Sequence, residues 1–357
     1  MRFAFVITNL AGGGAEKAVL KLAAGLACRD HKVEVVVLED RVEHEVPQGV
    51  RVHALCRKAS RGWIGKRLLA RQLALHLVPV PDLVVSTLPF ADEVTSLARI
   101  PRHWCRIANT LGSEIDRLTI ASPAKGRRRL TRYRQLYGRR PLIAVSSGVA
   151  EDLRLRLGVS NRIGVIPNPF DFPAIRLLAA EPCPTRPAGP YILHVGRFAK
   201  QKRHDLLLAA FARAELPHQL VLLTPHDPRL DALIAQNGLT HRITVAGFQL
   251  NPYAWMAGAE LLVLCSDHEG LPNVLIEALA CGTRVISTDC PSGPREILAG
   301  DLARGLVPCD DTKALALAMG AALTAPRPEP DVVAVALEPY TAERALDAWE
   351  ALARESS

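Results

Sequence analysis

The chain has 357 residues, 49% of them hydrophobic, and a formal net charge of +8. A chain of this length is too long to fold around a single hydrophobic core, so we predict two domains. The composition excludes a disordered or low-complexity protein. No apolar stretch reaches transmembrane length and no signal-peptide pattern is present, so we expect a cytoplasmic protein. The positive net charge predicts an anionic partner.

The first half of the chain alternates β-rich runs with helical patterns. Helical patterns cover residues 15–29 and 148–158. Short β-rich runs predict strands at 2–8, 33–38, 50–55, 82–87, 104–108 and 141–146. This alternation predicts a parallel sheet with crossover helices.

A glycine-rich turn follows the first predicted strand and opens a helical pattern. It contains Gly12, Gly13 and Gly14, and Glu16 follows at the start of the helix. Free N–H groups and the positive dipole end of a helix favour an anion, so this turn is a candidate phosphate loop. A tight turn without a ligand is an equally good interpretation. A dinucleotide fingerprint would need a third glycine where Lys17 stands, which argues against a dehydrogenase, although Glu39 could imitate its ribose-binding acid.

Two basic stretches carry the excess positive charge. Residues 57–78 hold six Lys or Arg, Trp63 and an apolar stripe, and residues 125–140 hold eight Lys or Arg and no acid. They predict contact with an anionic membrane surface, with Trp63 as an interfacial anchor. A solvated basic face is the alternative. Nucleic acid is not an expected partner, because Tyr133 and Tyr137 are the only interleaved aromatic residues of the second stretch.

The eight cysteines are scattered along the chain without a C-x-x-C pair. In a chain of this size we expect reduced, mostly buried thiols. A disulfide framework or a zinc site is not indicated.

The strand and helix alternation restarts after a proline-rich segment, residues 166–190, which predicts a linker. Strands are predicted at 191–196, 218–223, 242–246, 260–265 and 284–288, and helices at 203–214, 228–237, 252–258 and 312–323. The fold class is therefore α/β, with two Rossmann-like, doubly wound domains. Such sheets bind ligands at the carboxyl ends of their strands.

Cations follow the first strand of the second half. Gly196 ends the strand, and Arg197 and Lys202 stand on the way to the next helix. Preorganised cations at this position can hold a diphosphate and stabilise it as it leaves. A solvated basic loop is the alternative.

The stretch DHEGLPNVLIEALACG, residues 267–282, holds two glutamates eight apart. Pro272 is typical of a helix start and Gly282 of a helix end, and the residues between are apolar in nearly every direction. We therefore expect a buried helix in which Glu277 has a function, because an unpaired buried carboxylate is costly. A satisfied buried acid or an edge position is the alternative. Glu269 lies in the turn before the helix.

The stretch DCPSGPREIL predicts another capped helix start in the same half. Ser292 and Gly293 precede Pro294, which suits a first helical position, and Glu296 stands at the third. The turn also offers free backbone donors.

Together these stretches resemble the retaining glycosyltransferases of the GT-B fold, family 4. The residues EGLPNVLIEALACG resemble the family's E-x7-E signature, GRFAKQKRHDLLLAAF its phosphate clamp, and NLAGGGAEK its N-terminal glycine loop. PNPFD resembles its end-of-domain motif, and STDCPSGPREIL is typical of bacterial members. The resemblance spans roughly residues 5–300 in the family's order.

The resemblance implies a role for each matched residue. Residues 171–339 would bind a nucleotide-sugar donor, and residues 1–170 would bind the acceptor together with a returning helix, 340–357, whose Ala345, Leu346, Trp349 and Leu352 share a face. Glu269, Arg197 and Lys202 would be catalytic. The donor would be bound by Glu277, Gly270, Leu271, Pro272, Asn273, Gly196, Ser292 and Gly293. The acceptor and phosphate loop would include Gly12, Gly13, Gly14, Glu16 and Asn109.

This chain departs from the family at two positions. Asn109 stands where many members have a histidine, so the acceptor-side contact differs. Arg203 follows the clamp lysine where glycine is common, and we expect it to add a third cation beside the diphosphate.

The expected function is transfer of a hexose or N-acetylhexosamine from a nucleotide sugar, with UDP as the expected nucleotide, to a lipid-linked or glycan acceptor in surface-polysaccharide assembly. The resemblance implies retention of configuration, no cofactor and no metal, and the absence of an Asp-x-Asp pair from the chain fits a metal-independent reaction. The expected location is cytoplasmic, peripheral on the inner face of the membrane. The alternatives are a nucleotide-sugar epimerase of the same fold and a non-enzymatic protein that binds an anionic polymer.

Overall fold

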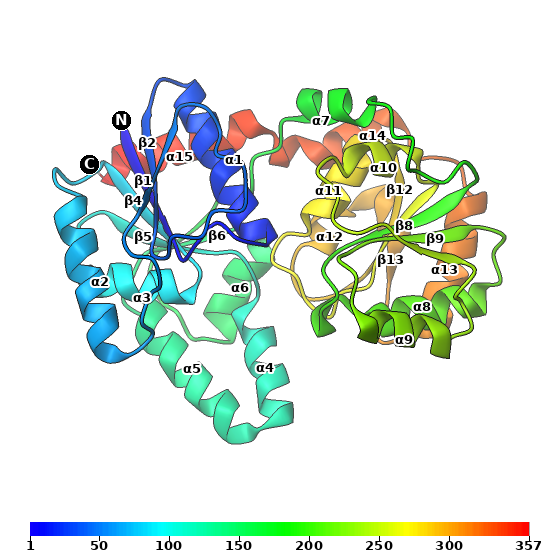
Figure 1. The fold of residues 1–357 in the computed structure, drawn as a ribbon, viewed down its shortest axis with the longest axis horizontal. Helices are drawn as coiled ribbons and strands as arrows, with labels where there is room; N and C mark the ends of the chain where they lie inside the picture. The colour runs from blue at the N-terminus through cyan, green and yellow to red at the C-terminus, as the bar shows by residue number, and fades with distance from the viewer. Residues whose placement is uncertain (357) are drawn as a thin grey trace. The chain divides into compact units, whose positions relative to one another are not determined.

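The computed structural model describes residues 1–356, which form two compact units (Figure 1). Unit 1 comprises Met1–Pro169 and the C-terminal helix α15 (Ala342–Ser356), and unit 2 comprises Phe170–Thr341. The first unit ends at 169 against the predicted 170, and the chain returns to it at 342 against the predicted 340.

Unit 1 is built on a seven-stranded parallel sheet with the strand order β3-β2-β1-β4-β5-β6-β7. Its strands are β1 (Arg2–Ile7), β2 (Lys32–Val37), β3 (Val50–Ala54), β4 (Leu83–Thr87), β5 (His103–Ile107), β6 (Leu142–Ala144) and β7 (Ile163–Val165). Its other helices are α1 (Gly14–Cys28), α2 (Trp63–His76), α3 (Pro89–Ala98), α4 (Leu111–Ala121), α5 (Pro123–Tyr137) and α6 (Ser147–Leu155).

Both faces of this sheet are buried, as its apolar strands require. On one face Phe5 packs with residues of α1 and α15, and on the other Val6 packs with residues of α2 and α3. The four residues predicted to share a face of the last helix are all buried. Among them, the Trp349 ring meets the Phe5 ring edge-on with 5.9 Å between centroids, so the end of the chain completes the core of unit 1.

Unit 2 repeats this plan with a six-stranded parallel sheet in the order β10-β9-β8-β11-β12-β13. Its strands are β8 (Tyr191–Val195), β9 (Gln219–Leu223), β10 (Ile243–Val245), β11 (Leu261–Leu264), β12 (Arg284–Thr288) and β13 (Leu306–Val307). Its α-helices are α7 (Phe172–Ala179), α8 (His204–Ala214), α9 (Pro228–Gln236), α10 (Tyr253–Gly258), α11 (Asn273–Ala280), α12 (Pro294–Ile297), α13 (Thr312–Thr324) and α14 (Pro330–Leu337). Short 3-10 turns are η1 (Lys200–Lys202), η2 (Gly300–Gly305) and η3 (Glu338–Tyr340).

The order of strands reverses at one place in each sheet. In unit 1 the chain leaves β1 in one direction for β2 and β3 and later continues on the other side of β1 with β4. In unit 2 the corresponding neighbours are β8 and β11. In open α/β sheets the crevice at this point, beyond the carboxyl ends of the strands, is where ligands bind.

Some predicted features differ from the structure. The segment 166–190 is not only a linker, because it contains α7, whose Ala174 N–H is capped by the Asp171 side chain at 2.9 Å. The thiols are all free, but the expectation that most are buried is wrong. Cys105, Cys265 and Cys290 are buried, while Cys28 and Cys309 are exposed, because the latter two lie at the end of a helix and in a loop. Across residues 1–356 no helix combines the length and apolar character needed to span a membrane.

Candidate active site

The cation loop of unit 2 follows β8. Gly196 comes directly after the strand, Arg197 is exposed, and Lys202 is the last residue of the turn η1. The Lys202 side chain does not extend into solvent: its Nζ lies 2.6 Å from Oε1 of Glu269. Two predicted catalytic residues, 67 positions apart in the chain, therefore form an ion pair.

Glu269 stands in the loop between β11 and α11, beside the switch point of the sheet. Glu269 is only 7% exposed, so its charge has to be stabilised by neighbouring groups instead of by water. The ammonium group of Lys202 is one partner, and the Glu269 backbone N–H donates to the carbonyl of Pro291 at 3.3 Å. Glu269 is thus held on two sides, its carboxylate by the cation loop and its backbone by the loop that follows β12.

The loops after β11 and β12 meet closely at Gly293. Gly270, Leu271 and Pro272 are buried, and a Cβ placed on Gly293 would lie 2.2 Å from Cδ of Pro272. Gly293 also has φ +89°, which side chains rarely tolerate, so glycine is required here for two reasons. Its neighbour Ser292 adopts φ +65° without being a glycine.

Glu277 lies one turn into α11 and is half-buried. The expectation that this helix is buried all round is wrong, because Asn273, Val274, Glu277 and Cys281 form a half-exposed edge while Leu275 and its apolar neighbours face inward. The hydroxyl group of Tyr253, on α10, donates to Oε1 of Glu277 at 3.2 Å. This contact fixes the carboxylate at the helix edge, where a ligand can reach it.

Arg203, which we expect to add a third cation beside the diphosphate, is not a free side chain in the structure. Its guanidinium binds three carboxylates: Asp205 at 3.0 Å, Asp267 at 2.8 Å, and Asp310. These contacts, the hydrogen bond with Asp205 first, raise the pKa of the guanidinium. The residue has φ +49° and ψ +49°, a left-handed conformation that costs a non-glycine residue about 1 kcal/mol.

Two buried histidines lie next to the cation loop. His194, on β8, is fully buried, and its Nδ1 lies 2.9 Å from the carbonyl oxygen of Val263. Because a carbonyl oxygen can only accept a hydrogen bond, the proton of this imidazole is on Nδ1. Its ring meets that of His204 edge-on at 4.7 Å. Burial, followed by the charge of Lys202, lowers the pKa of His204 to about 4, and burial also lowers the pKa of His194 well below its ordinary value. Both imidazoles are neutral near pH 7 and add no charge beside Lys202.

The predicted residues of unit 1 occupy the corresponding position in their own sheet. Gly12, with φ +120°, and Gly13, the N-cap of α1, follow β1, and a Cβ on Gly14 would meet nothing within 4 Å. Asn109 follows β5, and its Oδ1 accepts from the N–H of Thr110 at 2.9 Å. Glu16 lies in the first turn of α1.

Glu39 does not stand free to imitate a ribose-binding acid. Its carboxylate accepts from the Asn9 side chain at 3.1 Å and pairs with Arg61 at 3.2 Å.

Sequence reasoning missed two residues that organise the unit 2 site. Tyr253 lies 24 positions from Glu277, and Gln201, whose side-chain amide donates to the carbonyl of His268 at 2.5 Å, lies 67 positions from its partner. No local pattern marks either contact. The signal for Gln201 was its place between Arg197 and Lys202 on a loop already predicted to bind a ligand.

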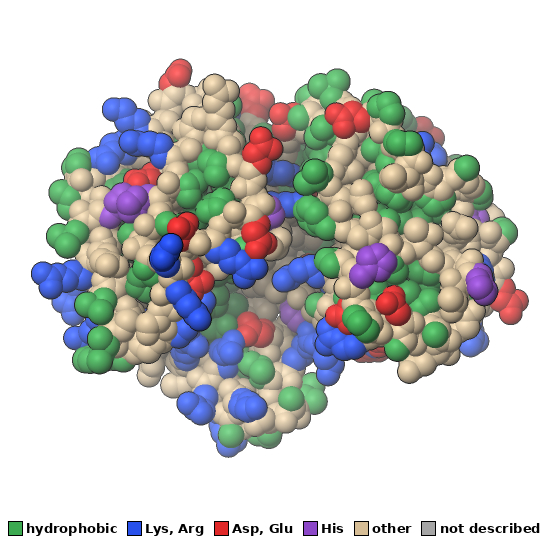
Figure 2. Space-filling view, in the orientation of Figure 1, with side chains coloured by type: hydrophobic (Ala, Val, Ile, Leu, Met, Phe, Trp, Pro, Cys, Tyr) green, Lys and Arg blue, Asp and Glu red, His purple; other side chains and the backbone are tan. Residues whose placement is uncertain are grey.

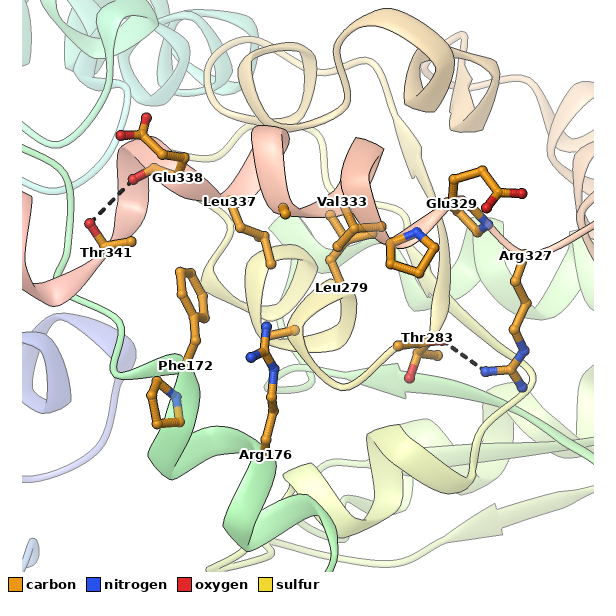
Figure 3. A pocket seen from close by; sticks show the side chains of 16 residues that line it. Phe172, Arg176, Leu279, Thr283, Arg327, Glu329, Val333, Leu337, Glu338 and Thr341 are labelled. Carbon is orange, nitrogen blue, oxygen red and sulfur yellow. Dashed lines mark hydrogen bonds between the residues drawn. The ribbon is translucent and has the colours of Figure 1, made fainter.

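A separate cavity of about 860 Å³ lies elsewhere in unit 2, between α7, α11 and α14 (Figure 3). Phe172, Leu279, Val333 and Leu337 give it an apolar lining, and Arg176 extends into it from α7. No predicted site residue lines it. The site described above is therefore distinct from this cavity.

Comparisons with known proteins agree with this arrangement. Residues 12–172 match the family described as Glycosyltransferase Family 4, and residues 189–325 match Glycosyl transferases group 1. The N-acetylgalactosamine-N,N'-diacetylbacillosaminyl-diphospho-undecaprenol 4-alpha-N-acetylgalactosaminyltransferase of Campylobacter jejuni is 31% identical over 324 residues, covering 87% of this chain and 86% of that protein. The lipopolysaccharide 1,6-galactosyltransferase of Salmonella typhimurium is 30% identical over 164 residues, covering 44% of this chain and 45% of that protein.

Solved structures share the fold. Anabaena HepE in complex with UDP superimposes with a TM-score of 0.74 and 18% identity, covering 99% of this chain and all of that one. The apo form of the lipopolysaccharide outer core galactosyltransferase WaaB superimposes with a TM-score of 0.72 and 19% identity over the full length of both chains. The two Rossmann-like units are those of the GT-B fold. The two family matches, with a relative aligned over most of both chains, show that this protein is a glycosyltransferase and belongs to family 4.

Proposed function

We propose that the protein transfers a hexose or N-acetylhexosamine from a UDP-linked donor to a lipid-linked or glycan acceptor, with retention of configuration and without a metal. The ion pair between Lys202 and Glu269 at the switch point of unit 2 carries this proposal. In this proposal Lys202 is the cation for the leaving diphosphate and Glu269 is the carboxylate for the reacting sugar, and the two stand on adjacent loops.

The two groups have complementary tasks during transfer. The bond between the anomeric carbon and the diphosphate oxygen breaks, a bond to the acceptor oxygen forms, and the acceptor proton passes to the leaving diphosphate. Lys202 and Arg197 stabilise the negative charge that develops on the diphosphate. As Lys202 turns to the phosphate, the carboxylate of Glu269 faces the positive charge that develops on the sugar. Glu277 accepts hydrogen bonds from the ribose hydroxyls.

The relatives support the donor and acceptor classes. The Campylobacter jejuni protein, by its name, acts on a diphospho-undecaprenol-linked sugar, and the Salmonella typhimurium protein acts on lipopolysaccharide. The Anabaena structure holds UDP in the same fold. We infer a lipid-linked acceptor in surface-glycan assembly from the first relative, because it aligns with nearly the whole chain.

A membrane-facing surface on unit 1 fits such an acceptor. Four large apolar side chains of α2 are exposed: Trp63 by 68%, Ile64 by 66%, Leu68 by 57% and Leu75 by 68%. Glu93 of α3 pairs with Lys66 of α2 and with Arg132 of α5, so the two basic stretches flank the same helix. Figure 2 shows Lys and Arg side chains gathered over α4 and α5. We propose peripheral binding to the cytoplasmic face of an anionic membrane through this surface.

A donor screen followed by site variants tests the function. UDP sugars are incubated with polyprenyl-diphosphate-linked acceptors, and products are analysed by mass and by NMR of the anomeric linkage. Glu277→Ala should raise the donor KM about tenfold, because charged hydrogen bonds to the ribose are lost. Lys202→Ala should lower kcat by about 100-fold or more, because a transition-state cation is lost.

Lys200→Ala is the matched control, because Lys200 lies exposed on the same turn. It should retain the wild-type rate. Thermal unfolding of Lys202→Ala, compared with that of Lys202→Ala combined with Glu269→Gln, which leaves no unpaired carboxylate, separates a catalytic loss from misfolding. Near-normal kinetics in Lys202→Ala would refute the assignment. An isomerised donor in the absence of acceptor would indicate an epimerase, and loss of activity with EDTA would exclude a metal-independent reaction.

A further inference from the structure

The loops that carry Lys202 and Glu269 are joined residue by residue. The backbone N–H of Asp267 donates to the carbonyl of Gln201 at 2.9 Å, and the side chain of Gln201 donates to the carbonyl of His268 at 2.5 Å. Lys202 and Glu269 then form the ion pair at 2.6 Å. Two consecutive residues of the loop after β8 thus contact three consecutive residues of the loop after β11.

Arg203 extends this junction to a third loop. Its Nη1 donates to Oδ1 of Asp267 at 2.8 Å and also to Oδ1 of Asp310, in the loop between β13 and α13. Its Nε donates to Asp205, in the first turn of α8, at 3.1 Å. A planar guanidinium has several N–H donors that point in different directions, so it can bind these three carboxylates at once, whereas the compact ammonium group of a lysine cannot.

The conformation of Arg203 supports a positive role for its side chain. The residue is held at φ +49°, a region that favours glycine, so an arginine here carries a conformational cost that a glycine would not. The side chain is 20% exposed and is held by its partners, which offset that cost. Glu215, at the other end of α8, has nearly the same φ of +48° and is exposed, which gives an internal reference for the backbone effect alone.

The charges point the same way. Without Arg203, the carboxylates of Asp205, Asp267 and Asp310 would stand together beside the site proposed for a diphosphate. Like charges at short range repel one another and also repel an anionic ligand. Arg203 both ties the three loops and neutralises this acidic cluster.

We propose that Arg203 is a positioning residue for the donor site: it holds the loops of Lys202 and Glu269 in register through Asp267 and Asp310. This inference rests on the proposed binding of a nucleoside diphosphate by unit 2. The residue does not touch the reacting atoms; it acts through Lys202 and Glu269.

Binding of UDP to the full-length protein, measured by calorimetry, tests the proposal without an acceptor. Arg203→Gly should raise the Kd for UDP at least tenfold. Arg203→Lys, which keeps the charge but not the fork, should recover part of this loss. Glu215→Gly should leave the Kd within twofold of the wild type. Thermal unfolding of each variant is recorded beside it, and the donor KM and kcat are measured with the donor found in the screen.

The outcomes separate the two levels of inference. Failure of the wild type to bind UDP would refute the proposed donor, whatever the variants do. Binding by the wild type with an unchanged Kd in Arg203→Gly would overturn the positioning role alone. If Arg203→Gly loses affinity only in proportion to a lower Tm, and a stabilising co-solvent restores its Kd, the residue is structural and the proposal fails. A weaker Kd at an unchanged Tm supports it.

Discussion

Glu277 illustrates how one contact settles the interpretation of a single residue. The apolar residues around Glu277 in the sequence predict a carboxylate inside a buried helix, yet Glu277 occupies a half-exposed edge of α11. Asn273, one turn earlier, lies on the same edge. Tyr253 donates to one carboxylate oxygen and so orients the group without neutralising it. A carboxylate that is oriented and still charged is suited to accept hydrogen bonds from vicinal hydroxyls.

Tyr253→Phe should therefore weaken donor binding without slowing the chemical step. Loss of one hydrogen bond that orients a carboxylate costs about 1 kcal/mol, which corresponds to roughly a fivefold higher donor KM with kcat unchanged. Steady-state kinetics at saturating acceptor measure both constants. Tyr253 is only 8% exposed, so its ring still packs in the Phe variant. A lower kcat with an unchanged KM would show that Tyr253 serves the transition state instead.

At the scale of elements, unit 1 contains a buried polar network that joins four of them. Asp92 of α3 is fully buried, and its carboxylate accepts from Ser86 of β4 at 2.5 Å and from Tyr137 of α5 at 2.8 Å. Ser86 also lies 2.8 Å from Nε2 of His103, on β5. The basic helix α5 is thereby anchored to the sheet through the hydroxyl group of its last residue.

This network predicts a pH-dependent stability. Burial raises the pKa of Asp92 from 3.8 to about 7, so the folded state holds a proton that the unfolded state has released, and its stability falls as pH rises from about 4 to about 7. The difference in unfolding free energy between Asp92→Asn and the wild type should grow by about 3 kcal/mol between pH 5 and pH 8. Urea unfolding of both proteins at the two pH values measures it.

His103 works in the opposite direction, which is why the comparison uses a variant. Burial lowers its pKa from 6.5 to about 3, so its contribution to stability is lost as pH falls below 6.5. This effect is common to the wild type and Asp92→Asn and cancels in their difference. Glu151→Gln, an exposed acid on α6, is the control and should differ from the wild type by less than about 0.5 kcal/mol at either pH. A difference for Asp92→Asn that does not change with pH would contradict the prediction.

The elements themselves were predictable to different degrees. Strands such as β1 and β11 were predictable to within a residue or two, because uninterrupted apolar runs mark a sheet buried on both faces. The helix α5 was not, because its basic residues hide the apolar period and only Gly126, Tyr133 and Tyr137 of its length are buried. The short helix α7 was hidden by the prolines around it.

In the site, too, positions marked by the local sequence were predictable, whereas contacts between residues far apart in the chain were not. The positions of Glu269 and Lys202 were predictable from the loops that follow strands, since strand ends gather at one edge of a parallel sheet. Their mutual ion pair was an outcome of the fold. The partners of Arg203 were not predictable, because Asp267 and Asp310 lie 64 and 107 positions away and no local pattern marks either contact.

At the scale of the whole molecule, the net charge of +8 is unevenly divided along the chain. Fourteen Lys and Arg residues fall in the two basic stretches of unit 1, six in residues 57–78 and eight in residues 125–140. The apolar side chains of α2 lie beside them, with the Arg67 guanidinium 4.4 Å from the Trp63 ring centroid. Unit 2 instead keeps its clamp cation Lys202 paired with an acid. In our proposal the two units serve different partners: unit 1 faces an anionic membrane surface, and unit 2 binds an anionic ligand.

Vesicle sedimentation should reveal this surface. Binding to vesicles of three parts phosphatidylcholine and one part phosphatidylglycerol should exceed binding to pure phosphatidylcholine, since each basic residue near an anionic surface contributes about 1 kcal/mol. High salt should weaken it. Replacing Trp63 and Leu68 with Ser should remove the apolar contribution, and replacing Arg127 and Arg128 with Ser the electrostatic one. Leu250→Ser is the control, because Leu250 is 91% exposed but lies in unit 2.

The pattern of losses decides between an anchored surface and a merely solvated one. If both contributions act together, either double variant should reduce the bound fraction by more than tenfold at limiting lipid, because two to three kcal/mol is lost in each case. The activity on a short water-soluble acceptor should stay at the wild-type level in both, since neither pair touches the donor site. Equal binding to neutral and acidic vesicles would reject the electrostatic contribution, and full binding by the Trp63 and Leu68 double variant would reject α2 as the anchor.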